Sequence, residues 1–170
     1  MSAPAKKSRL VFWVLAVAVI TAALDQLAKT AALQFLPPNK SIPVIGDLLK
    51  WRLTFNDSAA FSLGWGVTWI FTTIAAAAIL VGLWFARKVA SKSWAIMLGA
   101  LLGGVTGNFI DRILQAPGFP SGKVVDFIEI PFNFPIFNVA DMAISIVATL
   151  TVIRVLMGHS LGGNNSSSPE

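Results

Sequence analysis

The chain has 170 residues, of which 55% are hydrophobic and 12% are charged, and its net charge is +5. Because a soluble domain carries roughly 25% charged residues, this composition predicts a one-domain integral membrane protein and excludes a separate soluble catalytic domain. The chain has no cysteine, and its single histidine, His159, lies in a polar tail. Disulfides, thiolate nucleophiles, cysteine-ligated metals and a histidine-based triad are therefore excluded.

Four apolar segments are candidates for membrane spans. They are Leu10 to Leu24, which continues as helix-favouring sequence to Leu36, then Val67 to Ala86, Trp94 to Ile110, and Val139 to Met157. Basic residues ahead of the first segment also fit a cleaved signal peptide, but the helical sequence that follows it favours a span. We predict an all-α integral membrane protein with one four-helix transmembrane domain over residues 1–157. Residues 158–170 have the small polar composition of a disordered tail, which we place in the cytoplasm.

The basic residues favour cytoplasmic termini. One side of the predicted bundle has basic residues in short loops near span ends, namely Lys6, Lys7, Arg9, Arg87, Lys88, Lys92 and Arg154. The other side has six basic residues but seven of the eight acids. By the positive-inside rule the first side is cytoplasmic. The net charge then reflects membrane topology, and no nucleic-acid partner is expected.

A short strand pattern lies outside the spans. In LKWRLTFN, Leu49, Trp51, Leu53 and Phe55 alternate with polar residues, which is typical of a half-buried strand. We predict a small extracytoplasmic β-sheet over residues 42–56, resting on the outer membrane surface.

Several polar residues lie near the outer ends of the spans. Asp25 and Lys29 are four residues apart on one helix and would form an ion pair even without a catalytic role. Asn56, Asp57 and Ser58 suit either a site or a helix cap. Ionisable groups within membrane segments are costly, so each is a candidate functional residue.

The third span ends in a polar cluster. Gly99, Gly103 and Gly107 recur every four residues and form a smooth face for helix packing. Asn108, Asp111 and Arg112 follow in GNFIDR. The two charged residues fit ordinary interfacial positions or a functional site.

Asp126 and Asp141 form the strongest candidate pair. Asp126 lies in an extended segment, Asp141 begins the last span, and Asn138 lies three residues before it on the same helix face. Asn138 or Asp141 could instead only cap that helix. The Phe- and Pro-rich segment between the aspartates can double back and bring them together. Two adjacent carboxylates share one proton, so one could activate water while the other donates to a carbonyl oxygen. Glu129 is expected to point toward water, and no metal or other cofactor is expected, since hard cations need more oxygen ligands.

The motifs together resemble those of the prolipoprotein signal peptidases, or signal peptidase II. They are DQLAK from Asp25, NDSAAFS from Asn56, GGVTGNFIDR from Gly103, VVDF from Val124 and FNVAD from Phe137. The resemblance implies a membrane aspartic endopeptidase that cleaves diacylglyceryl-modified bacterial prolipoproteins before the lipidated cysteine and is inhibited by globomycin. It implies the bacterial cytoplasmic membrane, an active site near the extracytoplasmic face, and contact with membrane lipid; we expect a monomer.

The resemblance also assigns residues. Asp126 and Asp141 match the family's catalytic dyad. The other matched positions, which shape the pocket or bind substrate, are Asp25, Lys29, Asn56, Gly104, Asn108, Arg112, Asn138 and Ala140. Ser58 departs from the family, which commonly has glycine there, and the stretch from Arg112 to Asp126 is longer than in many members.

Two other classes of function compete with a peptidase. A small proton-coupled transporter could use the same acids as a relay, although no acid lies at mid-span and no inverted repeat is visible. A non-catalytic assembly protein would not need the paired polar motifs.

Overall fold

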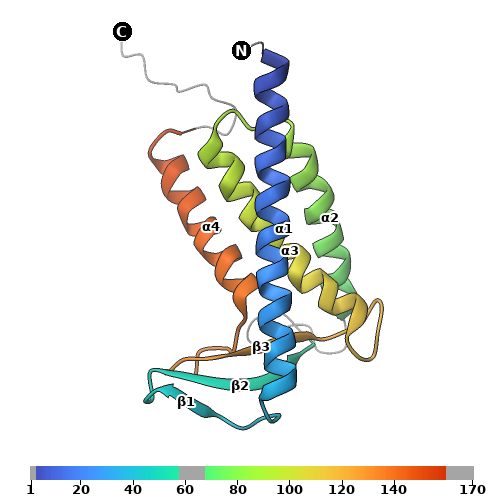
Figure 1. Ribbon diagram of the computed structural model, residues 1–170, viewed down its shortest axis with the longest axis vertical. Coiled ribbons are helices and arrows are strands. Elements are labelled where there is room, and N and C mark those ends of the chain that lie inside the picture. Colours follow the sequence, from blue (N-terminus) through green and yellow to red (C-terminus); the bar gives the residue numbers. More distant parts are fainter. Residues whose placement is uncertain (1–2, 58–67, 160–170) are drawn as a thin grey trace.

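The computed structural model describes residues 3–57 and 68–159, with side chains from residue 8 onward. Its helices are α1 (Ala3–Phe35), α2 (Thr68–Ala86), α3 (Lys92–Leu114) and α4 (Val139–Leu156). Among the described residues, these four helices are long and apolar enough to cross a membrane. The prediction of four spanning helices is confirmed. The start of α1 and the end of α4 lie at the same end of the bundle (Figure 1).

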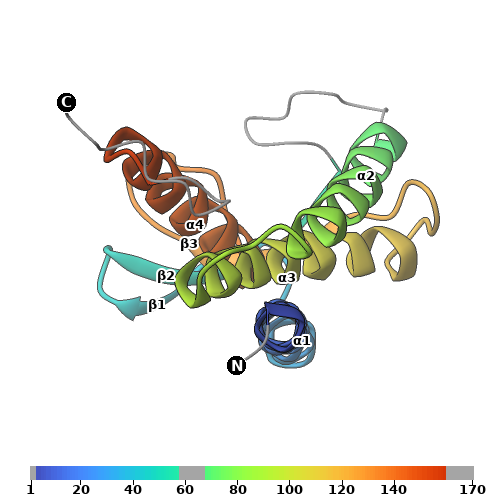
Figure 2. The same ribbon diagram turned by 90° about the horizontal axis from the view of Figure 1, so that it is seen from above.

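Helix α3 is the centre of the bundle and packs against the three other helices (Figure 2). Its glycine face allows α1 to lie very close: a Cβ on Gly103 would collide with Thr21, and one on Gly107 would collide with Asp25. The helix extends past the apolar segment from Trp94 to Ile110 and includes the polar cluster that was expected to end it. The helix continues to Leu114, because the face that begins with glycines ends in Asp111, which bonds to groups on α1.

A three-stranded antiparallel sheet lies at the end of the bundle where α4 begins (Figure 1). The strands are β1 (Ile42–Ile45), β2 (Leu49–Asn56) and β3 (Val124–Glu129), in that order. The predicted sheet over residues 42–56 is confirmed, and β3 extends it. Leu53, Val125 and Phe127 form an apolar cluster with Ala32 near the end of α1, and this cluster fixes the sheet to the bundle.

The segment between β3 and α4 folds back on the sheet. Ile128 and Phe137 exchange backbone hydrogen bonds of 2.8 and 3.1 Å. This pairing closes a loop over residues 129–136, so the start of α4 returns to the level of β3. Phe132 and Asn133 at the tip have positive φ values of 69° and 53°.

Some sequence-based predictions fall outside the described residues. They concern the basic side chains of Lys6 and Lys7, Ser58 with the rest of its motif to Ser62, and the tail beyond His159. The disorder of that tail and the single-domain boundary at residue 157 remain predictions.

Candidate active site

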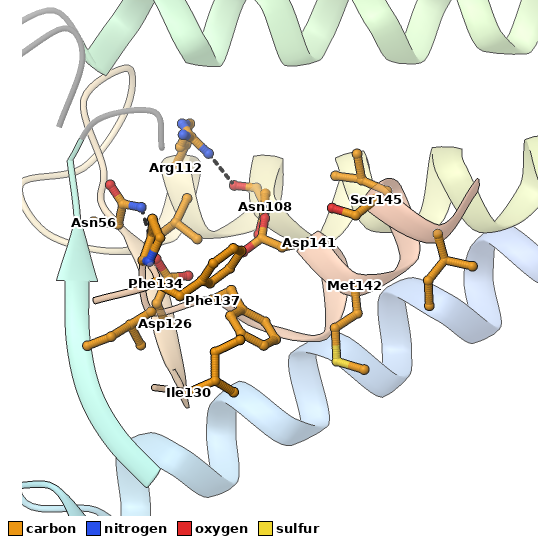
Figure 3. A pocket seen from close by; sticks show the side chains of 15 residues that line it. Asn56, Asn108, Arg112, Asp126, Ile130, Phe134, Phe137, Asp141, Met142 and Ser145 are labelled. Atoms are coloured by element: carbon orange, nitrogen blue, oxygen red, sulfur yellow. Dashed lines mark hydrogen bonds between the residues drawn. The ribbon is translucent and has the colours of Figure 1, made fainter. Parts of the chain in front are cut away.

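A cavity of about 580 Å³ lies between the sheet and the first turns of α4. Asp126 of β3 and Asp141 of α4 both line it, on either side of Phe137 (Figure 3). Most of the other lining side chains are apolar, among them Ile130, Phe134 and Ile144. The two carboxylates therefore face one mostly apolar space.

Asn138 connects the two aspartates. Its side-chain oxygen accepts from the backbone N–H of Asp141 at 3.0 Å, and Asp141 Oδ2 accepts from the backbone N–H of Asn138 at 3.1 Å. This reciprocal capping box starts α4. Asn138 and Asp141 therefore do cap the helix, as the sequence allowed. The amide nitrogen of Asn138 also donates to Asp126 Oδ1 at 2.6 Å. One residue thus caps the helix and ties it to β3.

Asp126 is almost fully buried, with 1% of its surface exposed. Burial, and after it the nearby charge of Asp141, raise the pKa of Asp126 to about 7. Hydrogen bonds donated by Asn56, at 2.9 Å to Oδ2, and by Asn138 lower this pKa in part. Near neutral pH the carboxyl group therefore exists in both protonation states.

Asn108 orients Asp141 from α3. Its amide nitrogen donates to Asp141 Oδ1 at 2.9 Å. Its side-chain oxygen accepts from the ammonium of Lys29 at 2.8 Å and from the amide of Asn138 at 3.2 Å. Because an ammonium can only donate, Lys29 fixes the Asn108 oxygen on its own side and leaves the nitrogen facing Asp141.

Lys29 is itself held by two carboxylates. Its ammonium lies 2.7 Å from Asp25 Oδ2 and 2.8 Å from Asp111 Oδ2, and all three side chains are at most 2% exposed. The expected pair of Asp25 and Lys29 is therefore present, as part of a larger cluster. Gln26 donates to Asp111 Oδ1 at 2.9 Å and to the Gly107 carbonyl at 3.0 Å. These bonds join α1 to the half of α3 that is nearer the sheet.

The same cluster reaches both elements that carry the aspartates. Asp111 Oδ2 accepts from the backbone N–H of Val125, next to Asp126, at 3.0 Å. Asp25 Oδ1 accepts from the backbone N–H of Ala140, next to Asp141, at 2.8 Å. The buried charges thus fix β3 and the start of α4 by their backbones, independently of the asparagines.

Gly104 and Ala140 belong to a close helix contact. A Cβ on Gly104 would lie 2.8 Å from the backbone oxygen of Ala140, so only glycine allows α3 and α4 to approach so closely here. Ala140 is completely buried. These two residues shape the site because their small size allows the two helices to pack closely.

Arg112 lies at the edge of the cavity. Its guanidinium donates to the backbone oxygen of Asn108 at 3.4 Å and lies 5.9 Å from the Phe71 ring. With 8% of its surface exposed, it does not have the exposed position of an ordinary interfacial charge. It supplies a positive charge beside two carboxylates.

The residues predicted for the site lie together at the sheet end of the bundle. Their contacts form one connected set of side chains and backbone groups, made by Asp25, Lys29, Asn56, Gly104, Asn108, Arg112, Asp126, Asn138, Ala140 and Asp141. The catalytic and binding roles of these residues remain proposals. Within residues 3–57 and 68–159, no three His, Asp or Glu side chains are grouped as a metal site would require.

Gln26 was missed as a site residue, whereas Asp111 was considered for a site but is not among the positions matched to the family. The signal for Asp111 was its spacing, four residues after Gly107 in the series of glycines that faces α1. Gln26 follows Asp25 on a helix that passes this face, yet its bond to Asp111 depends on how the two helices cross. Asp111 was therefore accessible to sequence reasoning, while Gln26 was not.

Residues 17–157 match the sequence model of the family described as signal peptidase (SPase) II. The chain belongs to the signal peptidase II family. Relatives named lipoprotein signal peptidase include that of Mycobacterium avium, 40% identical over 92% of this chain and 84% of the relative, and that of Mycobacterium tuberculosis, 42% identical over 92% and 77%. A solved structure described as a bacterial membrane enzyme has a TM-score of 0.78 and 29% identity, over 92% of this chain and 93% of that one.

Membership of this family supports three of the expectations from the sequence. The chain is a peptidase and thus a hydrolase, and it is a bacterial membrane protein. The family's substrates are prolipoproteins in the membrane. A proton-coupled transporter is not favoured. The family assignment leaves the chemical roles of individual side chains to be proposed.

Proposed function

We propose that this membrane protein is an aspartic endopeptidase that cleaves diacylglyceryl-modified prolipoproteins before the lipidated cysteine, with Asp126 and Asp141 as its catalytic dyad. The observation that carries the proposal is that two carboxylates from different elements face one apolar cavity and are held there by Asn56, Asn108 and Asn138. The hydrogen bonds fix the direction in which each carboxylate presents its oxygens.

The surroundings of the two carboxylates support different roles. Asp141 lies in the first turn of α4 and accepts from a backbone N–H and from Asn108, and a helix N-terminus stabilises negative charge. We assign it as the ionised base. Asp126 is buried and its pKa is raised to about 7, so we assign it as the proton donor.

The proposed reaction proceeds in two steps. Asp141 takes a proton from water while the water oxygen bonds to the scissile carbonyl carbon, and Asp126 gives its proton to the carbonyl oxygen. The tetrahedral intermediate then collapses: the C–N bond breaks, Asp141 gives its proton to the leaving amine, and Asp126 recovers a proton from an intermediate hydroxyl. Both carboxyl groups return to their starting states.

The cavity also suits a lipid-modified substrate. Met142, Ile144 and Ile146 of α4 continue the apolar lining of the cavity. Met142 lies farther along α4 than Asp141 (Figure 3). Acyl chains could lie along this surface while the peptide bond reaches the dyad. Because the substrate is itself anchored in the bilayer, a site at the end of the helices needs no aqueous tunnel.

We place the sheet and the dyad at the extracytoplasmic face and the chain termini in the cytoplasm. At the end opposite the sheet, cations lie over aromatic rings: Lys88 over Trp84 at 3.3 Å, Lys92 over Trp13 at 4.3 Å, and Arg154 over Trp94 at 4.8 Å. Basic residues near span ends favour the cytoplasm, and tryptophan marks an interface. The active form is proposed to be a monomer.

The test is cleavage of a diacylglyceryl-modified prolipoprotein by purified protein in lipid. Asp126→Asn and Asp141→Asn should each lower kcat by about 10²–10⁴-fold, which is the contribution of general acid or base catalysis. Asp57→Asn is the matched control, because Asp57 pairs with Lys123 outside the dyad cavity. Cleavage that survives either dyad substitution would refute the mechanism, and no cleavage by the parent protein would refute the function.

A further inference from the structure

A second cavity of about 390 Å³ lies on the sheet, on the other side of the loop over residues 129–136. Three side chains of that loop, Ile130, Phe134 and Ile136, line both this cavity and the dyad cavity. The two spaces are therefore separated only by the loop, and a chain leaving the dyad past Phe134 would enter the second one. Its size falls within the range of about 300–1,000 Å³ found for ligand pockets.

The second cavity has a different chemistry from the first. Its walls include two acids and two bases, Asp47, Lys50, Arg52 and Glu129. Lys50 lies 2.8 Å from Asp47, and Arg52 lies 3.5 Å from Glu129. Glu129 was expected to point toward water; it is instead 23% exposed, pairs with Arg52 and accepts from Ser41. A charged, partly open groove thus adjoins an apolar catalytic cavity.

We infer that this charged cavity binds the first polar residues that follow the lipidated cysteine in the substrate, and that its charges select among those residues. The inference rests on the proposed function. A prolipoprotein has two unlike sides at its scissile bond: an apolar signal segment in the membrane, and a polar chain that leads into water. The apolar lining along α4 suits the first, and the cavity on the sheet suits the second.

The exposure of its charges fits this role. The side chains of Lys50 and Arg52 are 30% and 40% exposed, whereas that of Asp47 at the rim is 96% exposed. These groups keep hydrogen-bonding capacity toward a bound peptide, because each ion pair uses only some of the donors and acceptors of its members. The Phe132 side chain at the loop tip is 96% exposed, which gives the peptide an apolar contact at the mouth.

The experiment changes the charge of Asp47, whose side chain is 96% exposed. The substitution therefore leaves the buried residues unchanged and preserves folding. Asp47→Lys makes the cavity more positive. Two lipidated substrates would be compared, identical except for acidic or basic residues at the second to fourth positions after the cysteine. The ratio of kcat/KM for the acidic over the basic substrate should rise about threefold to tenfold in the variant, as expected for exposed charge pairs.

Lys40→Glu is the control, because Lys40 is exposed on the sheet side of the molecule and does not line this cavity. It should leave the ratio unchanged. A third substrate, truncated directly after the cysteine, should be cleaved with the same kcat/KM by the parent and by Asp47→Lys. The inference is overturned if the ratio of kcat/KM for the two substrates does not change in Asp47→Lys. It is also overturned if Lys40→Glu changes that ratio by as large a factor as Asp47→Lys does. Absence of any cleavage by the parent protein would instead refute the proposed function.

Discussion

The ammonium of Lys29 lies 2.8 Å from the side-chain oxygen of Asn108, and this bond determines which end of the Asn108 amide faces Asp141. The buried lysine therefore acts on the dyad through an asparagine. Its two carboxylate partners, Asp25 and Asp111, hold it in place. The sequence alone explains Asp25 and Lys29 as an ion pair. In the structure, their cluster with Asp111 also positions Asn108 and, through it, Asp141.

Replacing Lys29 by methionine should lower kcat by about 10–100-fold with little change in KM, because a misplaced catalytic group can cost about 10²-fold. Loss of the cation also leaves Asp25 and Asp111 buried without a counterion, so the free energy of unfolding should fall by about 3–5 kcal/mol. Kinetics on the folded fraction, measured well below the melting midpoint, separate the two effects. Lys123→Met, at a lysine side chain 40% exposed, should change neither quantity. An unaltered kcat in Lys29→Met would contradict the positioning role.

The elements that dominate the fold are visible in the sequence because their signals are local. Hydropathy alone marks the second span between Val67 and Ala86, and period-two alternation marks β2. The segment between Asp126 and Asp141 was expected to double back because it is rich in proline and phenylalanine. In these cases the structure of a segment can be predicted from the pattern of its own residues.

Other features depend on contacts between distant segments. The extension of α3 through Asp111 is stabilised by groups on α1 about 85 positions earlier in the chain, Gln26 among them. The second cavity requires the pairing of Lys50 with Glu129 across β2 and β3. Neither the bond between Gln26 and Asp111 nor the second cavity could be predicted from the sequence, because each depends on how packed elements meet.

The proposed activity should decline at high pH. Asp126 has its pKa raised to about 7, so it holds its proton below that pH and loses it above. Since the mechanism needs that proton, log kcat/KM should fall with a slope near −1 above about pH 7. Asn56→Ala removes a hydrogen bond that lowers this pKa, so the decline should move to higher pH in the variant. A decline that stays in place or moves to lower pH would contradict the assignment of Asp126 as the donor.

Stability should also depend on the protonation of Asp126. Its pKa is about 7 in the folded protein and 3.8 for an ordinary aspartate, so the folded state binds the proton more tightly. The resulting stabilisation is complete below about pH 4 and is lost as the pH rises to about 7. Asp126→Asn carries no such charge, so its melting temperature relative to the parent should be higher at pH 8 than at pH 5. Asp57→Asn should show no comparable trend, and equal differences at both pH values would contradict the prediction.

Replacing Gly104 by valine should separate α3 from the start of α4. Even the first carbon of the new side chain would lie 2.8 Å from the backbone oxygen of Ala140 and 3.0 Å from Ile144, so the helices must move apart. Overpacking of this kind costs about 1–3 kcal/mol. The shift would also move Asp141 away from Asn108 on α3, so kcat should fall more than stability alone explains.

The matched control for Gly104→Val is Ala77→Val, which adds two methyl groups at an exposed position of α2. It should leave both melting temperature and kcat near the parent values. Gly104→Ala should have an intermediate effect, because it adds the clashing carbon without the branches. If all three variants cleave equally well at a temperature where each is folded, the close approach of α3 and α4 at Gly104 does not position the dyad, and the contact serves packing alone.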